Sequence, residues 1–169
     1  ILNIGGIANI TVISSGDFND LKSYDIGPGN CLLDEWIRKN SEERFDKNGE
    51  LAKAGKTDKS ILNQAIDNFD SIKNNNNPSF DVKDFDLNFV RGLSLNDGLS
   101  TLVDFTASLI YQAIVTSNNL DKGEKLNILI CGGGRKNLSL VNSIKDKLAS
   151  NMNLHLIDDY KIDGDFIES

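Results

Sequence analysis

The chain has 169 residues, of which 39% are hydrophobic and 25% are charged, as in a globular protein and unlike a disordered chain. Its formal net charge of −7 argues against a nucleic-acid backbone as a partner, because phosphates would be repelled over most of the surface. Two distant cysteines exclude a disulfide scaffold and a zinc site, and without 18 uninterrupted apolar residues the sequence predicts no membrane-spanning helix.

Three short strands open the chain. The first contains Leu2 and Ile4, the second runs over residues 7–13, and the third over residues 21–26. Polar turns between them predict an antiparallel meander. Because the first strand begins at residue 1 without an initiator Met, we expect the chain to be a piece of a longer protein.

Helical spacing follows a sharp break at residues 27–29. We expect a helix over residues 31–39 with Asn30 as its N-cap, then an exposed charged excursion over residues 41–59, and a short helix around residues 61–69. The strongest amphipathic pattern starts at Leu99, and Asn96-Asp97 is its expected cap.

The remaining elements alternate in type. A buried strand over residues 126–130 runs into three glycines, followed by a helix over residues 137–149 and a last strand over residues 154–157. Strands joined through helices run parallel, with right-handed crossovers. The order therefore predicts an α/β fold with a mixed five-stranded sheet, three antiparallel strands and then two parallel ones, flanked by helices.

Three motifs could carry chemistry. Gly5-Gly6 between two strands forms either a plain tight hairpin or an anion nest that touches a phosphate. Asp25, before a stiff Gly-Pro-Gly turn, is either a general base on a rigid element, a Mg²⁺ ligand, or an acid that only caps the turn. The run Gly132 to Gly134 is either a strand–helix turn or a bare surface for a nucleotide.

Other features have simpler interpretations. Trp36 is expected to be a core anchor, and His155 a surface or satisfied side chain. The acidic residues near the end of the sequence are expected to form a solvated loop, namely Asp158, Asp159, Asp163 and Asp165.

Taken together, the three motifs resemble the C-terminal lobe of the sugar kinase, actin and heat-shock chaperone ATPase superfamily. More narrowly, a series of segments covering essentially the whole chain resembles the 1,6-anhydro-N-acetylmuramic acid kinases: LNIGGIANIT, YDIGPGNCLLDEWI, FDKNGELA, GLSLNDGLSTLVDFTA and ILICGGGRKN. The resemblance implies a ribonuclease-H-like (actin-like ATPase) lobe. Residues 1–169 would be the C-terminal lobe of a two-lobed kinase, without its N-terminal lobe and final helix, and with an insert over about residues 41–93.

The resemblance also implies an activity. A cytoplasmic kinase would use ATP and Mg²⁺ to hydrolyse the 1,6-anhydro bridge of 1,6-anhydro-N-acetylmuramic acid and phosphorylate O6, giving N-acetylmuramic acid 6-phosphate and ADP during murein recycling. Its partners would be this small-molecule sugar and ATP, with neither nucleic acid nor membrane, and a homodimer of the full-length protein is compatible with it.

The resemblance assigns roles to individual residues. Asp25 matches the catalytic aspartate, which takes a proton from the water that attacks C1, and Glu168 matches a glutamate near the sugar and the water. The metal ligands are unknown at this point. The expected binding residues are Gly5, Gly6 and Asn9 on the phosphate hairpin, Gly132, Gly133, Gly134 and Asn137 at the adenosine loop, and Gly27, Gly29 and Asn30 at the substrate.

One departure and two alternatives stand beside this prediction. Val82 occupies a position where relatives carry an arginine, and the neighbouring Lys83 has a different donor geometry. The chain could instead be an inactive truncated remnant that at most binds nucleotide. It could also be another sugar kinase or ATPase of the same superfamily.

Overall fold

The computed structural model describes residues 1–13, 20–73, 79–117 and 125–165. Their strands form one five-stranded sheet in the order β3-β2-β1-β4-β5, in which β1, β2 and β3 pair antiparallel while β1, β4 and β5 pair parallel. The expected mixed sheet is confirmed. The strands are β1 (Leu2–Ile4), β2 (Ile7–Val12), β3 (Lys22–Pro28), β4 (Leu126–Cys131) and β5 (Met152–Leu156).

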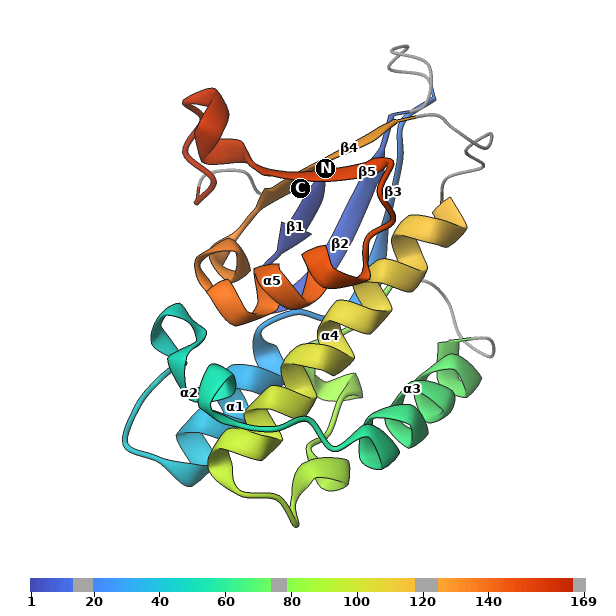
Figure 1. Cartoon of the computed structure of the whole chain (residues 1–169). Coiled ribbons are helices and arrows are strands. Elements are labelled where there is room, and N and C mark those ends of the chain that lie inside the picture. Colours follow the sequence, from blue (N-terminus) through green and yellow to red (C-terminus); the bar gives the residue numbers. More distant parts are fainter. Residues whose placement is uncertain (14–19, 74–78, 118–124, 166–169) are drawn as a thin grey trace.

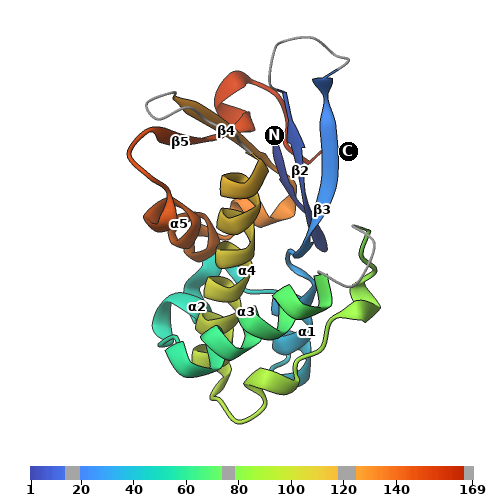
Figure 2. The same ribbon diagram turned by 90° about the vertical axis from the view of Figure 1, so that its right-hand side faces the viewer.

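The helices form a second layer and extend beyond one end of the sheet. In Figures 1 and 2 the sheet occupies the upper part of the molecule, and α1, α2 and α3 lie below it. The long helix α4 joins the two parts, because it packs against β2 and β3 as well as against the four other helices. The helices are α1 (Cys31–Asn40), α2 (Glu50–Ala54), α3 (Lys59–Lys73), α4 (Leu95–Ser117) and α5 (Leu138–Lys147).

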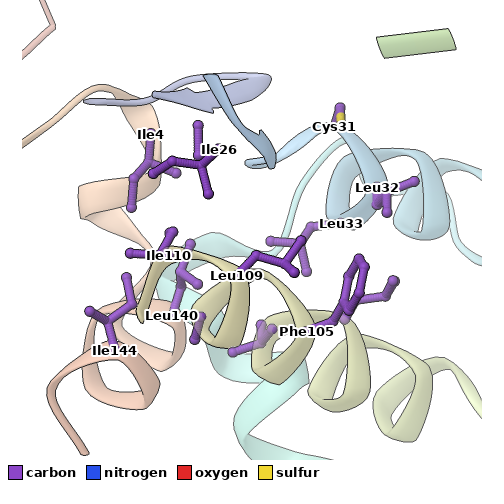
Figure 3. Close-up of a cluster of buried hydrophobic side chains, with 14 of the residues drawn as sticks. Ile4, Ile26, Cys31, Leu32, Leu33, Phe105, Leu109, Ile110, Leu140 and Ile144 are labelled. Atoms are coloured by element: carbon purple, nitrogen blue, oxygen red, sulfur yellow. The ribbon is translucent and has the colours of Figure 1, made fainter. Parts of the chain in front are cut away.

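The core lies between the sheet and α4. Ile4 of β1 and Ile26 of β3 point toward Leu109 and Ile110 of α4, and residues of α5 close the other side (Figure 3). These four side chains are at most 2% exposed. Burial of each such side chain stabilises the fold by about 1.5–3 kcal/mol, so this layer holds the site's strands in place.

Helix α4 is long and apolar enough to cross a membrane by length and composition alone, but 67% of its apolar stretch of 18 residues is buried inside the protein. Its apolar residues contact the sheet and the neighbouring helices. The composition of α4 is therefore explained by its place at the centre of the core.

Two expected caps differ from the structure. Asn30 makes no side-chain cap, and its amide instead donates to the Ile4 carbonyl at 3.4 Å. Helix α4 begins at Leu95, and Ser94 rather than Asn96-Asp97 caps it, because its Oγ accepts from the Asp97 N–H at 3.2 Å. The Asn30 side chain therefore bonds to a strand carbonyl instead of α1, and the Ser94 hydroxyl takes the capping role for α4.

The expectation of an exposed excursion over residues 41–59 holds only in part, since most of these residues are exposed but Asp46, Gly49 and Ala52 are buried. Helix α2 packs against α4 and α5, and its Ala52 is buried. The buried carboxylate of Asp46 orders this turn by accepting from the N–H groups of Leu51 and Ala52, both at 2.9 Å. The charged residues of this segment do not predict these contacts, because the contacts involve backbone N–H groups and the small side chain of Ala52.

Close packing of α1 on α4 predicts the effect of Gly98→Ala. A Cβ at Gly98 would lie 2.6 Å from ring atoms of Trp36, whose Nε1 donates to the Leu95 carbonyl at 3.0 Å. Although alanine favours helix, we expect the substitution to lower the free energy of unfolding by about 1–3 kcal/mol.

Urea unfolding measures this loss, with Gly92→Ala as the matched control, because a Cβ at Gly92 meets nothing within 4 Å. A Gly98→Ala protein as stable as the control would contradict the packing of Trp36 described above.

Candidate functional site

Four of the five strands end on the same side of the sheet, and three of them, β1, β3 and β4, lead into the glycine motifs. Strand β1 is parallel to β4, and both β1 and β3 are antiparallel to β2, so the carboxyl ends of β1, β3 and β4 coincide. The Gly5-Gly6 turn, residues 27–30 and the Gly132–Gly134 loop therefore meet at one end of the sheet. Ligands of open α/β sheets bind outside the carboxyl ends of strands.

The Gly-Pro-Gly turn docks directly on the glycine hairpin. The N–H groups of Gly29 and Cys31 donate to the Gly6 carbonyl at 2.9 and 3.2 Å, and the N–H of Asn30 donates to the Gly5 carbonyl at 2.8 Å. A Cβ at Gly29 would overlap the Gly5 carbonyl oxygen. Only glycine allows this approach, so the first two motifs are one structural unit.

The third motif packs against the same hairpin. Gly132 has a φ of 78°, and a Cβ there would overlap the side-chain oxygen of Asn3. A Cβ at Gly134 would overlap the side chain of Ile4. The amide of Asn30, which reaches the Ile4 carbonyl, lies beside Gly134, where a Cβ would be 3.2 Å away. The strand end of β1 thus joins all three motifs.

Three other glycines of these motifs are not required by packing. A Cβ at Gly5 would meet only the Ile7 carbonyl oxygen at 3.5 Å, one at Gly6 only Val82 at 3.9 Å, and one at Gly133 only Asn30 at 3.8 Å. These are ordinary contacts, and none of the three has a positive φ. A ligand that lies against the backbone would explain why these positions lack side chains.

A row of polar residues crosses the sheet on the face away from α4. Asn3 of β1 pairs with Asn9 of β2, and Asn9 pairs with Asp25 of β3. Residues directly opposite in an antiparallel pair share a face, and Ile26 next to Asp25 points into the core (Figure 3). This row connects Asp25 to Gly132, which contacts Asn3.

Asp25 is half-buried, and a backbone group from a distant segment holds it. The N–H of Phe80 donates to its Oδ2 at 3.1 Å. Phe80 is fixed by ring contacts with Phe69 and Phe85, at centroid distances of 5.6 and 5.5 Å. This hydrogen bond fixes the orientation of the carboxylate relative to the end of β3. Asp25 is therefore a positioned acceptor, as a general base requires.

The expected substrate glycines are explained by the same packing. Gly27 is buried, and a Cβ there would lie 2.9 Å from the Phe69 ring. Gly29 contacts the hairpin as described above. Their contact with a substrate stays a prediction, and it would be made through their backbone atoms.

A pocket of about 440 Å³ opens beside Gly133. It lies between the start of α1 and the turn over residues 45–48, and Asn30, Asp34, Lys136 and Asn137 also line it. Asn137 caps α5, because its Oδ1 accepts from the Leu140 N–H at 3.1 Å. Burial raises the pKa of Asp34. The pocket joins a bare backbone surface to both acidic and basic side chains.

The acidic residues near the end of the sequence are not simply solvated. Asp158, Asp163 and Asp165 all surround the guanidinium of Arg135, whose side chain is only 5% exposed. Hydrogen bonding to Arg135 lowers the pKa of Asp158, and hydrogen bonding to Arg135 and Lys136 lowers the pKa of Asp165. The interpretation as a solvated acidic loop is wrong for Asp158 and Asp165, which hydrogen-bond to the arginine next to the glycine run, whereas Asp159 is exposed as expected.

Two expected features require separate comment. Glu168 lies outside the described residues, so its place is not part of the site above. Among the described residues there is no group of three His, Cys, Asp or Glu side chains that could hold a metal ion.

Burial raises the pKa of the Cys31 thiol to about 11, which keeps it protonated and excludes it as a nucleophile at neutral pH.

Sequence reasoning missed three residues that shape the site: Asn3, Phe80 and Arg135. Arg135 follows the glycine run directly, which was an available signal. Phe80 acts through its backbone N–H, 55 residues away from Asp25 in the sequence, and no side-chain pattern marks such a contact.

The lowered pKa values predict a pH dependence. Asp158 and Asp165 have folded-state pKa values below the ordinary 3.8, so their stabilising effect is complete above that pH and is lost as the pH falls through the lowered values. We expect the wild type to lose more stability than the double variant Asp158→Asn/Asp165→Asn between about pH 6 and about pH 3.

Thermal unfolding of both proteins across this range checks the difference. Parallel loss of melting temperature in the two proteins would show that the carboxylates do not stabilise the fold through Arg135.

The fold has a counterpart among solved structures. The activator of the 2-hydroxyisocaproyl-CoA dehydratase from Clostridium difficile with bound ADPNP matches with a TM-score of 0.53 and 12% sequence identity, over 92% of this chain and 52% of that chain. At this identity the likeness shows the fold alone. The chain has the α/β fold of actin-like ATPases, with its mixed five-stranded sheet flanked by helices.

Sequence comparison identifies the family. The chain is 62% identical over 169 residues to the anhydro-N-acetylmuramic acid kinase of Pelagibacter ubique (strain HTCC1062), covering 100% of this chain and 45% of that relative. It is 37% identical over 145 residues to that of Caulobacter vibrioides (strain ATCC 19089 / CIP 103742 / CB 15), covering 85% and 37%. It thus spans less than half the length of these curated relatives. Since the family model for anhydro-N-acetylmuramic acid kinase matches residues 1–169, the chain belongs to that family.

Proposed function

We propose that this chain is the C-terminal lobe of a two-lobed cytoplasmic kinase that binds ATP and acts on 1,6-anhydro-N-acetylmuramic acid in murein recycling. The observation that carries the proposal is the set of open glycines, Gly5, Gly6 and Gly133, at the same end of the sheet as Asp25. Family membership supports the sugar, and the span of less than half a relative supports a second lobe.

The open glycines would contact different parts of the nucleotide. The Gly5 N–H donates to the Ile7 carbonyl at 3.2 Å, so the Gly5-Gly6 hairpin would offer a phosphate the N–H of Gly6 and a surface without side chains. The net charge of −7 makes such local binding necessary. Gly133 offers a bare surface at the mouth of the pocket, where a ribose and base would lie. Lys136 also lines the pocket, with its ammonium paired to Asp165 at 2.6 Å.

Mg²⁺ would accompany the phosphates. It is often held by one or two carboxylates together with phosphate oxygens and water, rather than by a cage of protein ligands. The described residues offer Asp25 as one such carboxylate, and this limited supply fits a metal shared between the nucleotide and another lobe. When bound, Mg²⁺ would neutralise charge on the transferred phosphoryl group.

Asp25 would serve as the general base. With its Oδ2 held by the Phe80 N–H, its carboxylate would take a proton from the water whose oxygen bonds to C1. The C1–O6 bond then breaks, and the released O6 attacks the γ-phosphorus of ATP, giving the 6-phosphate and ADP. Phosphoryl transfer depends mainly on positioning and charge neutralisation, so one placed base is sufficient in this lobe.

A second candidate is a folded remnant that binds nucleotide without catalysis. The observation that favours it is Val82, an uncharged residue 3.9 Å from the Cβ position of Gly6, where the resemblance implies an arginine. A hybrid enzyme separates the two candidates: the matching segment of the Pelagibacter ubique relative is replaced by this chain, and sugar-dependent ADP release is measured. Release of ADP supports the kinase, and its absence from a folded hybrid supports the remnant.

The first prediction of this proposal concerns Gly133→Ala. Because a Cβ there meets protein atoms only at 3.8 Å, the melting temperature should change little, but the methyl group would occupy the nucleotide's surface. We expect the dissociation constant for ADP, measured by calorimetry, to rise about tenfold, which corresponds to about 1.4 kcal/mol.

Two controls define this result. Gly92→Ala should change neither property, and Gly132→Ala should destabilise the fold, because Gly132 has a φ of 78° and contacts Asn3. Unchanged ADP affinity in Gly133→Ala would place the nucleotide elsewhere.

The second prediction concerns Asp25→Asn in the hybrid enzyme. The amide keeps the shape of the carboxylate but cannot accept the proton, so kcat should fall by about 10²–10⁴-fold with little change in stability. Steady-state kinetics with the anhydro-sugar measures this fall. The matched control is Asp67→Asn, an equal charge change at an exposed position of α3. Near-normal turnover in Asp25→Asn would refute the assignment of the base.

A further inference from the structure

We propose that Arg135 is a positioning residue for the nucleotide, held by residues 158–165 so that the Gly132–Gly134 loop keeps its binding shape before any ligand arrives. This inference rests on the proposed nucleotide site and adds to it a residue that does not itself touch the nucleotide. We name residues 158–165 the acidic clamp.

The guanidinium of Arg135 is buried and fully engaged. Its Nε and Nη2 donate to the two carboxylate oxygens of Asp158 at 2.7 and 3.0 Å, and its Nη1 donates to Asp165 at 2.6 Å. Asp163 lies farther away, with its Oδ1 3.7 Å from Nη2. A buried arginine requires such compensation, whereas the carboxylates are 44–58% exposed and could remain in water without it. The clamp is therefore organised by the arginine.

Both backbone polar groups of Gly132 are tied to this assembly. The Gly132 carbonyl accepts from Arg135 Nη1 at 3.0 Å, and the Gly132 N–H donates to the Gly164 carbonyl at 2.9 Å. Gly132 is also the loop residue with a positive φ. The clamp and the arginine thus fix the residue at which β4 turns toward the open surface of Gly133.

The geometry requires arginine rather than any cation. The planar guanidinium donates to Asp158 from Nε and Nη2, while Nη1 donates to both Asp165 and the Gly132 carbonyl. A Cβ at Gly164 would lie 2.5 Å from Arg135 Nε, so the guanidinium also packs flat on the clamp backbone. A lysine has one nitrogen at the end of a flexible stem and cannot make these contacts together.

The test compares four forms of the chain: wild type, Arg135→Lys, Asp158→Asn and Asp67→Asn. The two Asp→Asn variants make the same change of charge at an exposed carboxylate, but Asp158 makes the paired hydrogen bonds to Arg135, whereas Asp67 lies on α3, outside the clamp. The readouts are the ADP dissociation constant by calorimetry, the melting temperature, and hydrogen exchange of the Gly132 amide without ligand. The KM for ATP and kcat of the hybrid enzyme complete the set.

We expect Arg135→Lys and Asp158→Asn to weaken ADP binding on the order of tenfold or more, since small misplacements of a binding group have large effects. The Gly132 amide should exchange faster in both, the KM for ATP should rise more than kcat falls, and Asp67→Asn should match the wild type. If Arg135→Lys does not fold, the two Asp→Asn variants decide the question.

The outcomes that overturn the inference are distinct from those that overturn the proposed function. Wild-type affinity and wild-type exchange in Arg135→Lys or Asp158→Asn would overturn the inference alone. Equal loss in Asp158→Asn and Asp67→Asn would also overturn it, because that would show only a general charge effect. No ADP binding by the unchanged chain or the hybrid enzyme would overturn the proposed function and this inference together.

Discussion

The contact between Gly29 and the Gly5-Gly6 hairpin is the constraint on which the candidate site depends. Three backbone N–H groups at the start of α1 donate to the two hairpin carbonyls, and a side chain at Gly29 would prevent their approach. This contact orients the end of β3, and with it Asp25, relative to the hairpin. The pairing of Asp25 with Asn9 holds the base in the sheet, and this contact adds the orientation of the turn after Asp25 on the hairpin, on which positioning depends.

The glycines of the site serve two purposes that only contacts distinguish. Gly29, Gly132 and Gly134 allow protein segments to approach one another, whereas Gly5 and Gly133 have room for a side chain. The first group builds the end of the sheet, and the second leaves it bare. A ligand that lies against the backbone needs both, because a bare surface is useful only where the loops that carry it are held in place.

The two loops of the site are supported by segments from far along the chain. The aromatic contacts of Phe80 bring its N–H to Asp25, and the acidic clamp brings three carboxylates to Arg135. Each support acts on a group next to the proposed reacting atoms. The structure thus combines a rigid sheet end with separate holders for the base and for the nucleotide loop.

The sequence by itself determined the order of the strands and of helices α1, α3, α4 and α5, the mixed sheet, and the three motifs with their relation to a known family. Those features depend on local periodicity and on glycine positions, which are visible in one dimension. Only the tertiary structure decided that Asn30 reaches Ile4 instead of capping α1, that residues 41–59 dock, and that Asp158 binds Arg135. These contacts join residues distant in sequence or act through backbone atoms, and no local pattern records where a folded chain brings such groups together.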